Sequence, residues 1–151
     1  MGLESDFMAL ALAEARAAAG RDEVPVGAVV TDAAGRVLVV AGNRCEELSD
    51  PLAHAEFLAL RRLQQLRPGV SYFSDCTVWV TLEPCSFCAA AMVGLRVRRV
   101  VFAAYDSKGG AVEHGPRLFE RVTSLWRPEV VGGVCEKEAG DLLRDFFQGK
   151  R

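Results

Sequence analysis

Two short stretches of this chain, His54-Ala55-Glu56 and Pro84-Cys85-Ser86-Phe87-Cys88, restrict its fold most strongly, because together they predict one metal site. Cys85 and Cys88 stand three residues apart directly behind a proline, which favours a helix start with both thiols on one face. Zn²⁺ prefers thiolate and imidazole ligands. The chain has two histidines, His54 and His114, and His54 also lies near an expected helix start. We therefore expect a fold that brings His54 against Cys85 and Cys88.

A carboxylate beside the predicted ligands, Glu56, indicates a catalytic rather than a structural metal. A catalytic zinc has three protein ligands and keeps a fourth position for water, whereas structural sites are usually closed by four. No fourth cysteine or histidine has suitable spacing. A water on zinc loses its proton more readily, at a pKa of about 7, and Glu56 can take that proton and return it to a leaving amine. The pair Cys85 and Cys88 alone would leave a redox site or a structural zinc open.

Alternating strand and helix patterns predict the scaffold that carries this site. Apolar, β-branched runs indicate strands, and amphipathic or alanine-rich runs indicate helices. The expected strands cover residues 24–31, 36–41, 76–81, 99–103 and about 130–131, and the expected helices cover residues 6–20, 53–66, 85–94, 117–121 and 136–147. Residues 45–51 and 106–116 are expected to be loops. The alternation predicts an α/β layer with helices on both faces, and a hairpin of the first two strands makes the sheet mixed.

Length, charge and cysteine content narrow the class of protein. The 151 residues correspond to one domain, residues 1–151. No apolar run approaches the roughly 18 residues that cross a bilayer, and the first residues lack the basic start of a secretory signal, so no membrane and a cytoplasmic location are expected. Five cysteines then favour free thiols or a metal over disulfides. A net charge of −2 disfavours indiscriminate nucleic-acid binding, but residues 91–151 carry 11 basic and 8 acidic side chains and leave room for one phosphate-binding face.

The pattern H-x-E…P-C-x-x-C, here His54-Ala55-Glu56 and Pro84-Cys85-Ser86-Phe87-Cys88, resembles the signature of zinc nucleobase deaminases. Beyond that signature the chain resembles the bacterial tRNA adenosine deaminases over nearly its whole length. The matching pieces are Val24-Pro25-Val26-Gly27-Ala28-Val29, Gly42-Asn43-Arg44, Asp50-Pro51, Ala53-His54-Ala55-Glu56, Ala59-Leu60-Arg61, Val80-Thr81-Leu82-Glu83-Pro84-Cys85, Cys88-Ala89, Arg99-Val100-Val101-Phe102 and Asp145-Phe146-Phe147. The resemblance implies a three-layer α/β/α cytidine deaminase-like fold with a five-stranded mixed sheet, and usually a homodimer. It also implies deamination of adenosine to inosine at the wobble position of a tRNA anticodon stem-loop, with one zinc per chain.

Site roles follow from the resemblance position by position. It implies that His54, Cys85 and Cys88 bind zinc and that Glu56 moves protons. Further roles fall on residues that would contact the RNA. The resemblance implies backbone amides of Ala55 and Cys85 near the reacting centre, Asn43 as a hydrogen-bond partner of the flipped-out adenine, Val26 and Ala28 as pocket walls, and Asp106, Lys108, Phe146 and Phe147 as contacts to flanking nucleotides. One phenylalanine of the last pair is expected in the core.

Some positions depart from the family pattern, and other functions stay open. Leu52, Phe87 and Ala90 replace residues that are frequent in relatives, and they change packing rather than ligands. His114 lies in a loop that differs from relatives, where a histidine without a role is more common than one that touches substrate. A deaminase of free guanine or cytosine on the same scaffold is the first alternative and suits the acidic net charge. An inactive partner subunit with a structural zinc is the second, but Glu56 argues against it.

Overall fold

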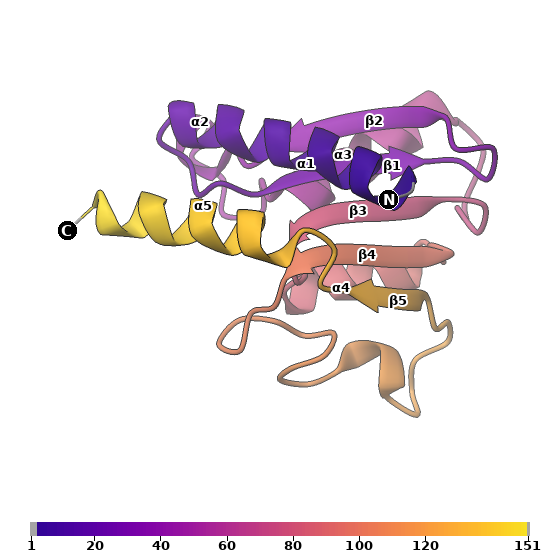
Figure 1. The fold of residues 1–151 in the computed structure, drawn as a ribbon. Helices are drawn as coiled ribbons and strands as arrows, with labels where there is room; N and C mark the ends of the chain where they lie inside the picture. Colours follow the sequence, from indigo (N-terminus) through magenta and orange to yellow (C-terminus); the bar gives the residue numbers. More distant parts are fainter. Residues whose placement is uncertain (1–2, 151) are drawn as a thin grey trace.

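The protein is a three-layer α/β/α structure built on one five-stranded sheet (Figure 1). The computed structural model describes residues 3–150. In chain order the elements are α1 Leu3–Gly20, β1 Gly27–Thr31, β2 Val37–Gly42, α2 Cys45–Leu48, α3 Ala55–Leu66, β3 Thr77–Leu82, α4 Ser86–Gly94, β4 Arg99–Ala104, the 3₁₀ helix η1 Leu118–Glu120, β5 Glu129–Gly132 and α5 Glu136–Gln148. The predicted fold class is confirmed.

The sheet is mixed, as the opening hairpin predicts. Its strand order is β2-β1-β3-β4-β5. Strand β1 runs antiparallel to both β2 and β3, whereas β3, β4 and β5 run parallel to one another. Because of these directions, the start of β1 and the ends of β2, β3 and β4 meet at one edge of the sheet. Ligand sites of α/β sheets form outside the carboxyl ends of the strands, so this edge is where a site is expected.

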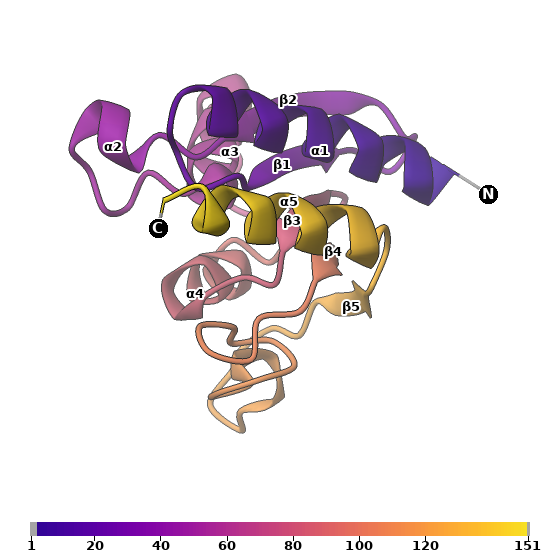
Figure 2. The ribbon, with the colours of Figure 1, turned by 60° about the vertical axis from the view of Figure 1, so that its left-hand side comes forward.

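Helices cover both faces of the sheet, and each pair encloses its own apolar core (Figure 2). Helices α1 and α5 lie on one face and α3 and α4 lie on the other. The first core packs Met8, Ala11, Leu12 and Ala139 against Val29, Trp79, Val101 and Ala103, and the second packs Ala59, Leu60, Leu63 and Met92 against Val30, Val78, Val80 and Val100. The β-branched strand residues, buried on both faces, explain why the strands have almost continuous apolar sequences.

Helix α1 lies unusually close to the start of β1, and a glycine permits it. A Cβ atom added to Gly27 would lie 1.9 Å from the carbonyl oxygen of Ala11 and 2.7 Å from the amide nitrogen of Ala15. No side chain fits at those distances. The alanines on this side of α1 are fully buried, so small residues on the helix and on the strand together bring the two backbones together.

Two expectations about the N-terminal half need correction. The first strand begins at Gly27 rather than at residue 24, and residues 45–51, expected as a loop, contain the short helix α2. The later strand start agrees with a local turn, because the backbone N–H of Val26 donates to the carbonyl of Val24 at 2.8 Å. The short helix is explained by Glu23, which is buried in the α1–β1 connection and accepts the backbone N–H groups of Glu46 and Glu47 at 3.0 and 2.7 Å. A helix start needs such acceptors, and here they come from a residue more than twenty positions away.

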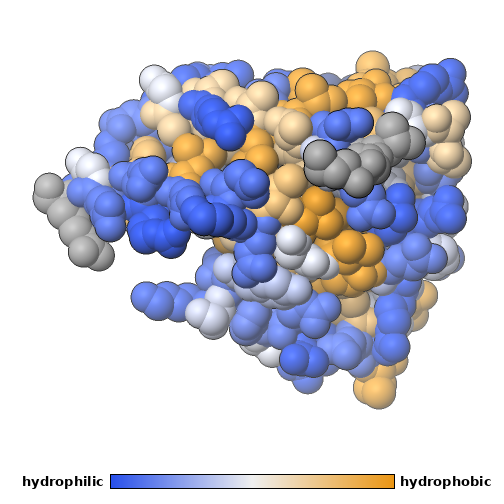
Figure 3. Space-filling view, in the orientation of Figure 1, coloured by the Kyte–Doolittle hydropathy of each residue, from blue (hydrophilic) through white to orange (hydrophobic). Residues whose placement is uncertain are grey.

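The face of the protein seen in Figure 3 carries both hydrophobic and hydrophilic areas. Along α5, the outward side chains are mostly hydrophilic (Figure 3). The end of α5 and the loop after β4 project on the same side, with a notch between them. Within residues 3–150, no helix combines the length and the apolar character needed to cross a membrane.

Candidate active site

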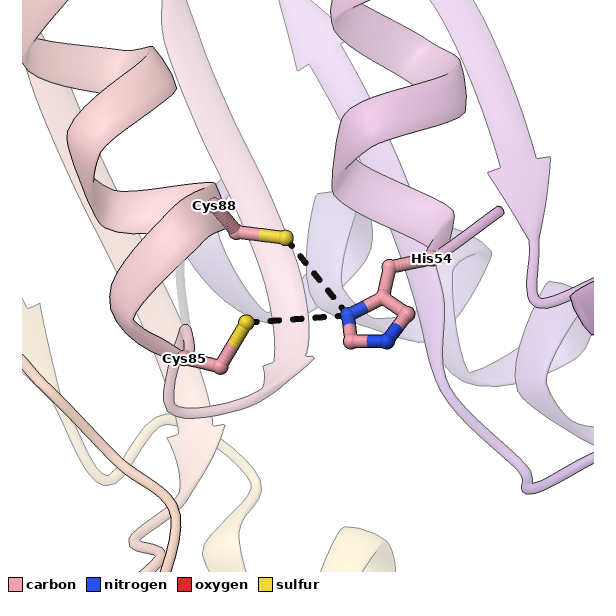
Figure 4. A group of neighbouring side chains, drawn as sticks. All are labelled: His54, Cys85 and Cys88. Carbon is pink, nitrogen blue, oxygen red and sulfur yellow. Dashed lines mark hydrogen bonds between the residues drawn. The ribbon is translucent and has the colours of Figure 1, made fainter. Parts of the chain in front are cut away.

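The predicted metal ligands come together at the starts of two helices. His54 is the residue directly before α3, and Cys85 is the residue directly before α4, both with extended backbone, while Cys88 lies in the first turn of α4. The Nδ1 atom of His54 lies 3.7 Å from Sγ of Cys85 and 3.6 Å from Sγ of Cys88 (Figure 4). The three side chains point toward one another from opposite helices. The sequence-based ligand set is therefore brought to one point.

This donor set has the chemistry and spacing for zinc. All three ligand atoms lie within 4.8 Å of one another. Tetrahedral zinc with Zn–S of about 2.3 Å and Zn–N of about 2.0 Å separates its sulfur and nitrogen ligands by about 3.6 Å. The distances from His54 to the two cysteines agree with that value. Two thiols and one imidazole leave one tetrahedral position for water or substrate, which is the pattern of catalytic rather than structural sites.

The neighbouring groups favour the thiolate form of Cys85. The hydrogen bond from Cys88, together with the contact to His54, lowers the pKa of Cys85 to about 4. The same contact and burial raise the pKa of Cys88, so without a cation one proton stays in the pair. The hydrogen bond with Cys85 raises the pKa of His54. A dication at this point reverses the pattern for Cys88 and His54, because a coordinating thiol is deprotonated outright and an imidazole binds in its neutral form.

Glu56 lies beside the predicted ligands and is shielded from solvent. It is in the first turn of α3, two residues after His54, and only 4 % of its surface is exposed. Burial raises the pKa of its carboxyl group to about 7. A cation held by the neighbouring ligands would favour the carboxylate and lower this pKa. A carboxyl group that titrates near neutral pH is suited to take up and release a proton during a reaction.

Asn43 is fixed by a hydrogen bond that determines which of its atoms faces the site. Its Oδ1 accepts the backbone N–H of Ala55 at 2.7 Å, and its own backbone N–H donates to the carbonyl of Val26 at 3.1 Å. Since the Ala55 amide is a donor, Asn43 must present its oxygen there and keep its NH₂ group for a ligand. The Ala55 amide is therefore occupied in this structure, and it orients Asn43 instead of facing the reacting centre.

A cavity of about 630 Å³ opens next to these residues. It lies at the sheet edge where β1 starts and where β2, β3 and β4 end, and the end of α5 adds one more wall. The lining comprises the central residues Val26, Asn43, His54, Glu56, Leu82, Glu83 and Cys85, and the rim residues Asp22, Glu23, Val24, Cys45, Glu46, Asp106, Gly109, Phe146 and Lys150. Its volume falls within the range of about 300–1,000 Å³ that is usual for small-ligand sites.

Of the remaining residues predicted to contact substrate, some line this cavity and others lie outside it. Asp106 and Phe146 line it. Lys108 and Phe147 are exposed outside it, and the Phe147 ring packs edge-on against Phe146 with centroids 5.4 Å apart. Ala28 does not line the cavity. It is fully buried in β1, in the core that also contains residues of α3.

The expectation that one of the two phenylalanines belongs to the core is wrong. Phe146 is half-buried at the cavity and Phe147 is 49 % exposed. Helix α5 covers the sheet with Ala139 and Leu143 near its beginning. Its last turns extend past the sheet edge, where no strand lies beneath them (Figure 1).

Two buried carboxylates to which the sequence assigned no role line the cavity. Glu23 and Glu83 are 1 % and 2 % exposed, and each accepts backbone N–H groups from a connecting segment. His114 belongs to the second of these arrangements, because its Nδ1 lies 2.8 Å from Oε1 of Glu83. The sequence signal that could have indicated a role is the position of each glutamate. Glu23 follows α1 and precedes Val24-Pro25, and Glu83 follows β3 and precedes Pro84.

Comparison with known proteins agrees with this geometry. A family model for the cytidine and deoxycytidylate deaminase zinc-binding region matches residues 1–104. This chain belongs to that family. It is 47 % identical to the tRNA-specific adenosine deaminase of Agrobacterium fabrum, over 100 % of this chain and 98 % of the relative. The predicted resemblance is confirmed, and membership in the family makes zinc the metal for His54, Cys85 and Cys88.

Comparison with solved structures also finds deaminases. One, from a study of A-to-I editing by tRNA:A34 deaminases at the wobble position of transfer RNA, superposes with a TM-score of 0.87 at 46 % identity and covers 91 % of this chain and 99 % of that one. A guanine deaminase from Nitrosomonas europaea superposes with a TM-score of 0.73 at 25 % identity, over 94 % of this chain and 83 % of that one. The scaffold is therefore shared between deaminases of different substrates.

Proposed function

We propose that this protein is a single-domain, zinc-dependent hydrolase that converts adenosine to inosine at the wobble position of a tRNA anticodon. The observation that carries the proposal is the full-length match to a tRNA-specific adenosine deaminase. The site supports it, because one cavity joins the metal ligands, the buried carboxyl of Glu56 and the donor group of Asn43. The overall reaction replaces the amino group of the base with oxygen from water and releases ammonia.

Base recognition follows from the cavity walls. A base inside an anticodon loop can be splayed out into a pocket and read by hydrogen bonds and apolar contacts. The NH₂ group of Asn43 would donate to an acceptor nitrogen of the purine ring. Val26 and Leu82 offer apolar contact to the ring faces, and Phe146 at the rim offers a stacking surface for a flanking base.

The proton transfers fall to Glu56. Zinc, held by His54, Cys85 and Cys88, supplies a Lewis acid that makes water a nucleophile near neutral pH. The carboxylate of Glu56 would accept a proton from the attacking water and deliver it to a ring nitrogen of the base. It would then accept the second proton from the hydroxyl group newly bonded to the ring carbon and deliver it to the amino group, which departs as ammonia while the carbonyl forms. Burial raises the pKa of Glu56 and the nearby zinc would lower it, so the two effects oppose each other and the carboxyl group can both accept and release a proton. The Cys85 backbone N–H, at the start of α4, would steady the developing negative charge.

The decisive experiment supplies an anticodon stem-loop with adenosine at the wobble position and measures inosine. We expect conversion by the wild-type chain and a loss of about 10²–10⁴-fold in kcat for Glu56→Gln, which is the usual contribution of a general acid–base group. Zinc content should stay near one per chain in this variant, since Glu56 is not a ligand. Loss of the metal in Glu56→Gln would contradict the separation of ligand from proton carrier.

A free nucleobase is the second candidate substrate, because the cavity rim is acidic. Among the described residues that line the rim, Asp22, Glu46 and Asp106 are acidic, whereas Lys150 is the one cation and is paired with Asp22. Carboxylates disfavour phosphate, whereas a neutral base has no such penalty. Conversion of free guanine or cytosine, with none of the stem-loop, would establish this candidate in place of the first.

We also propose that the protein works as a cytoplasmic homodimer. Support comes from a shallow groove of about 290 Å³ between α3 and α4, lined by Phe57, Leu60, Arg61, Gln64, Ala91, Gly94 and Leu95. Phe87 lies beside it, 36 % exposed, with its ring 6.1 Å from that of Phe57. Light scattering should give about twice the chain mass of 16.4 kDa, and a monomer at micromolar concentration would count against the dimer.

A further inference from the structure

Glu83 is a carboxylate enclosed by the loop that follows β4. It comes directly after β3 and two residues before the zinc ligand Cys85, and its side chain has no exposed surface. Its backbone N–H donates to the carbonyl of Ala104 at 2.8 Å, which fixes it to the last residue of β4. A carboxylate in such a place is costly unless its oxygens are fully hydrogen-bonded.

Both oxygens of Glu83 are satisfied by one loop. Oε1 accepts the backbone N–H of Asp106 at 3.0 Å and faces Nδ1 of His114 at 2.8 Å, and Oε2 accepts the backbone N–H groups of Val112, Glu113 and His114 at 3.2, 2.8 and 3.0 Å. These donors come from the beginning and the end of the loop, so one carboxylate closes it into a ring. Burial alone would raise the pKa of Glu83, yet the hydrogen bonds from these backbone N–H groups hold it below its ordinary value, in agreement with an acceptor-only carboxylate.

The loop backbone approaches this anion most closely at Gly110, where a side chain has no space. A Cβ atom at Gly110 would lie 2.5 Å from the carboxyl group of Glu83 and 2.5 Å from the carbonyl oxygen of Asp106. The backbone N–H of Ala111 donates to the carbonyl of Pro84 at 2.9 Å. The loop is therefore wrapped around the turn that presents Cys85 to the metal, with glycine at the closest approach.

This loop supplies one wall of the active-site cavity through Asp106 and Gly109. We propose that Glu83, with His114 as its side-chain partner, is a positioning residue that holds this wall at a fixed distance from the metal turn. It sets how well substrate binds without taking part in the chemistry. The inference rests on the proposed function for the identity of the substrate but not for the anchoring itself.

The test compares Glu83→Gln with Glu120→Gln, a control whose exposed carboxylate is paired only with Arg117 at the surface. Glutamine keeps the shape of the side chain but turns an NH₂ group toward backbone donors, so charge-assisted hydrogen bonds are lost. We expect roughly tenfold faster amide hydrogen exchange over residues 106–114 in the RNA-free, zinc-loaded protein. We also expect KM for the stem-loop to rise roughly tenfold, with kcat within threefold of wild type and one zinc per chain. His114→Ala should show the same pattern with a smaller change, and the control should match wild type.

Two results would overturn the proposal. Unchanged exchange over residues 106–114 would show that Glu83 does not hold the loop. Zinc loss, or a fall in kcat at unchanged KM, would show that it supports the metal turn instead. If Glu83→Gln fails to fold, Gly110→Ala takes its place, because the new Cβ pushes the loop off the carboxylate without altering residue 83. If the wild type acts on free guanine rather than on the stem-loop, KM is measured for guanine, and the exchange result still decides whether the anchor exists.

Discussion

Gly27→Ala is expected to be among the most destabilising single-methyl additions in this protein. The new Cβ atom would lie 1.9 Å from the carbonyl oxygen of Ala11, whereas ordinary contacts begin at 3.4 Å, so α1 would have to retreat from the sheet by about 1.5 Å. A gap of that size forfeits much of the dispersion energy of the contacts it opens. Met8, Ala15 and Ala18, all fully buried, lie on the face that would separate.

The expected cost is about 3 kcal/mol, the upper part of the usual range for overpacking. For a chain of this length, each kcal/mol corresponds to about 2–4 °C in Tm, so Tm should fall by about 6–12 °C. Gly140→Ala is the matched control, because nothing lies within 4 Å of its Cβ position in the middle of α5. That change should raise the free energy of unfolding by about 0.5–1 kcal/mol. Calorimetry of the zinc-loaded proteins measures both, and a Gly27→Ala variant with the Tm of wild type would refute the close packing of α1 on β1.

Three further measurements address the site. Chelation of zinc should lower Tm, and zinc should restore it, because a ligand that binds only the folded chain stabilises it; an unchanged Tm would exclude a metal at His54, Cys85 and Cys88. The pKa of Glu83 lies below its ordinary value of 4.5 in the folded chain, so its contribution to stability is complete above 4.5 and is lost as pH falls below it. Zinc-free Glu83→Gln should therefore show a shallower loss of denaturant midpoint below pH 4.5 than wild type, and equal slopes would contradict this. Phe146→Ala should raise KM for the stem-loop several-fold and more than Phe147→Ala does, because only Phe146 lines the cavity; the reverse order would place the contact outside it.

The sequence predicted the metal centre well because its information is local. Cys85 and Cys88 are fixed by one helix turn, and the small number of histidines leaves His54 as the natural third ligand. The strands were also predictable, since layers covered on both faces require apolar, β-branched runs. Glu56 follows from its spacing to His54, which places it in the same helix turn.

The features that the sequence did not predict depend on contacts between residues far apart in the chain. Helix α2 depends on the carboxylate oxygens of Glu23 as hydrogen-bond acceptors, and no pattern within residues 45–48 predicts it. Ala28 lies in β1 and Val26 lies just before it, and the alternation of residues along the chain does not reveal where a cavity ends. His114 appeared to be a loop histidine without a role until the fold placed it against Glu83. The positions of Phe146 and Phe147 depend on how far α5 extends past the sheet edge, which only the assembled structure defines.

The order of the site along the chain has a consequence for how such enzymes diversify. All three ligands and Glu56 precede residue 89, whereas one cavity wall comes from residues 106–109 and another from residues 146–150. The family model ends at residue 104, between these two groups. The metal ligands and the walls that face the base thus precede β4, whereas the outer walls of the cavity follow it. We expect substitutions after β4 to change contacts with the nucleotides around the target base while the metal ligands stay intact.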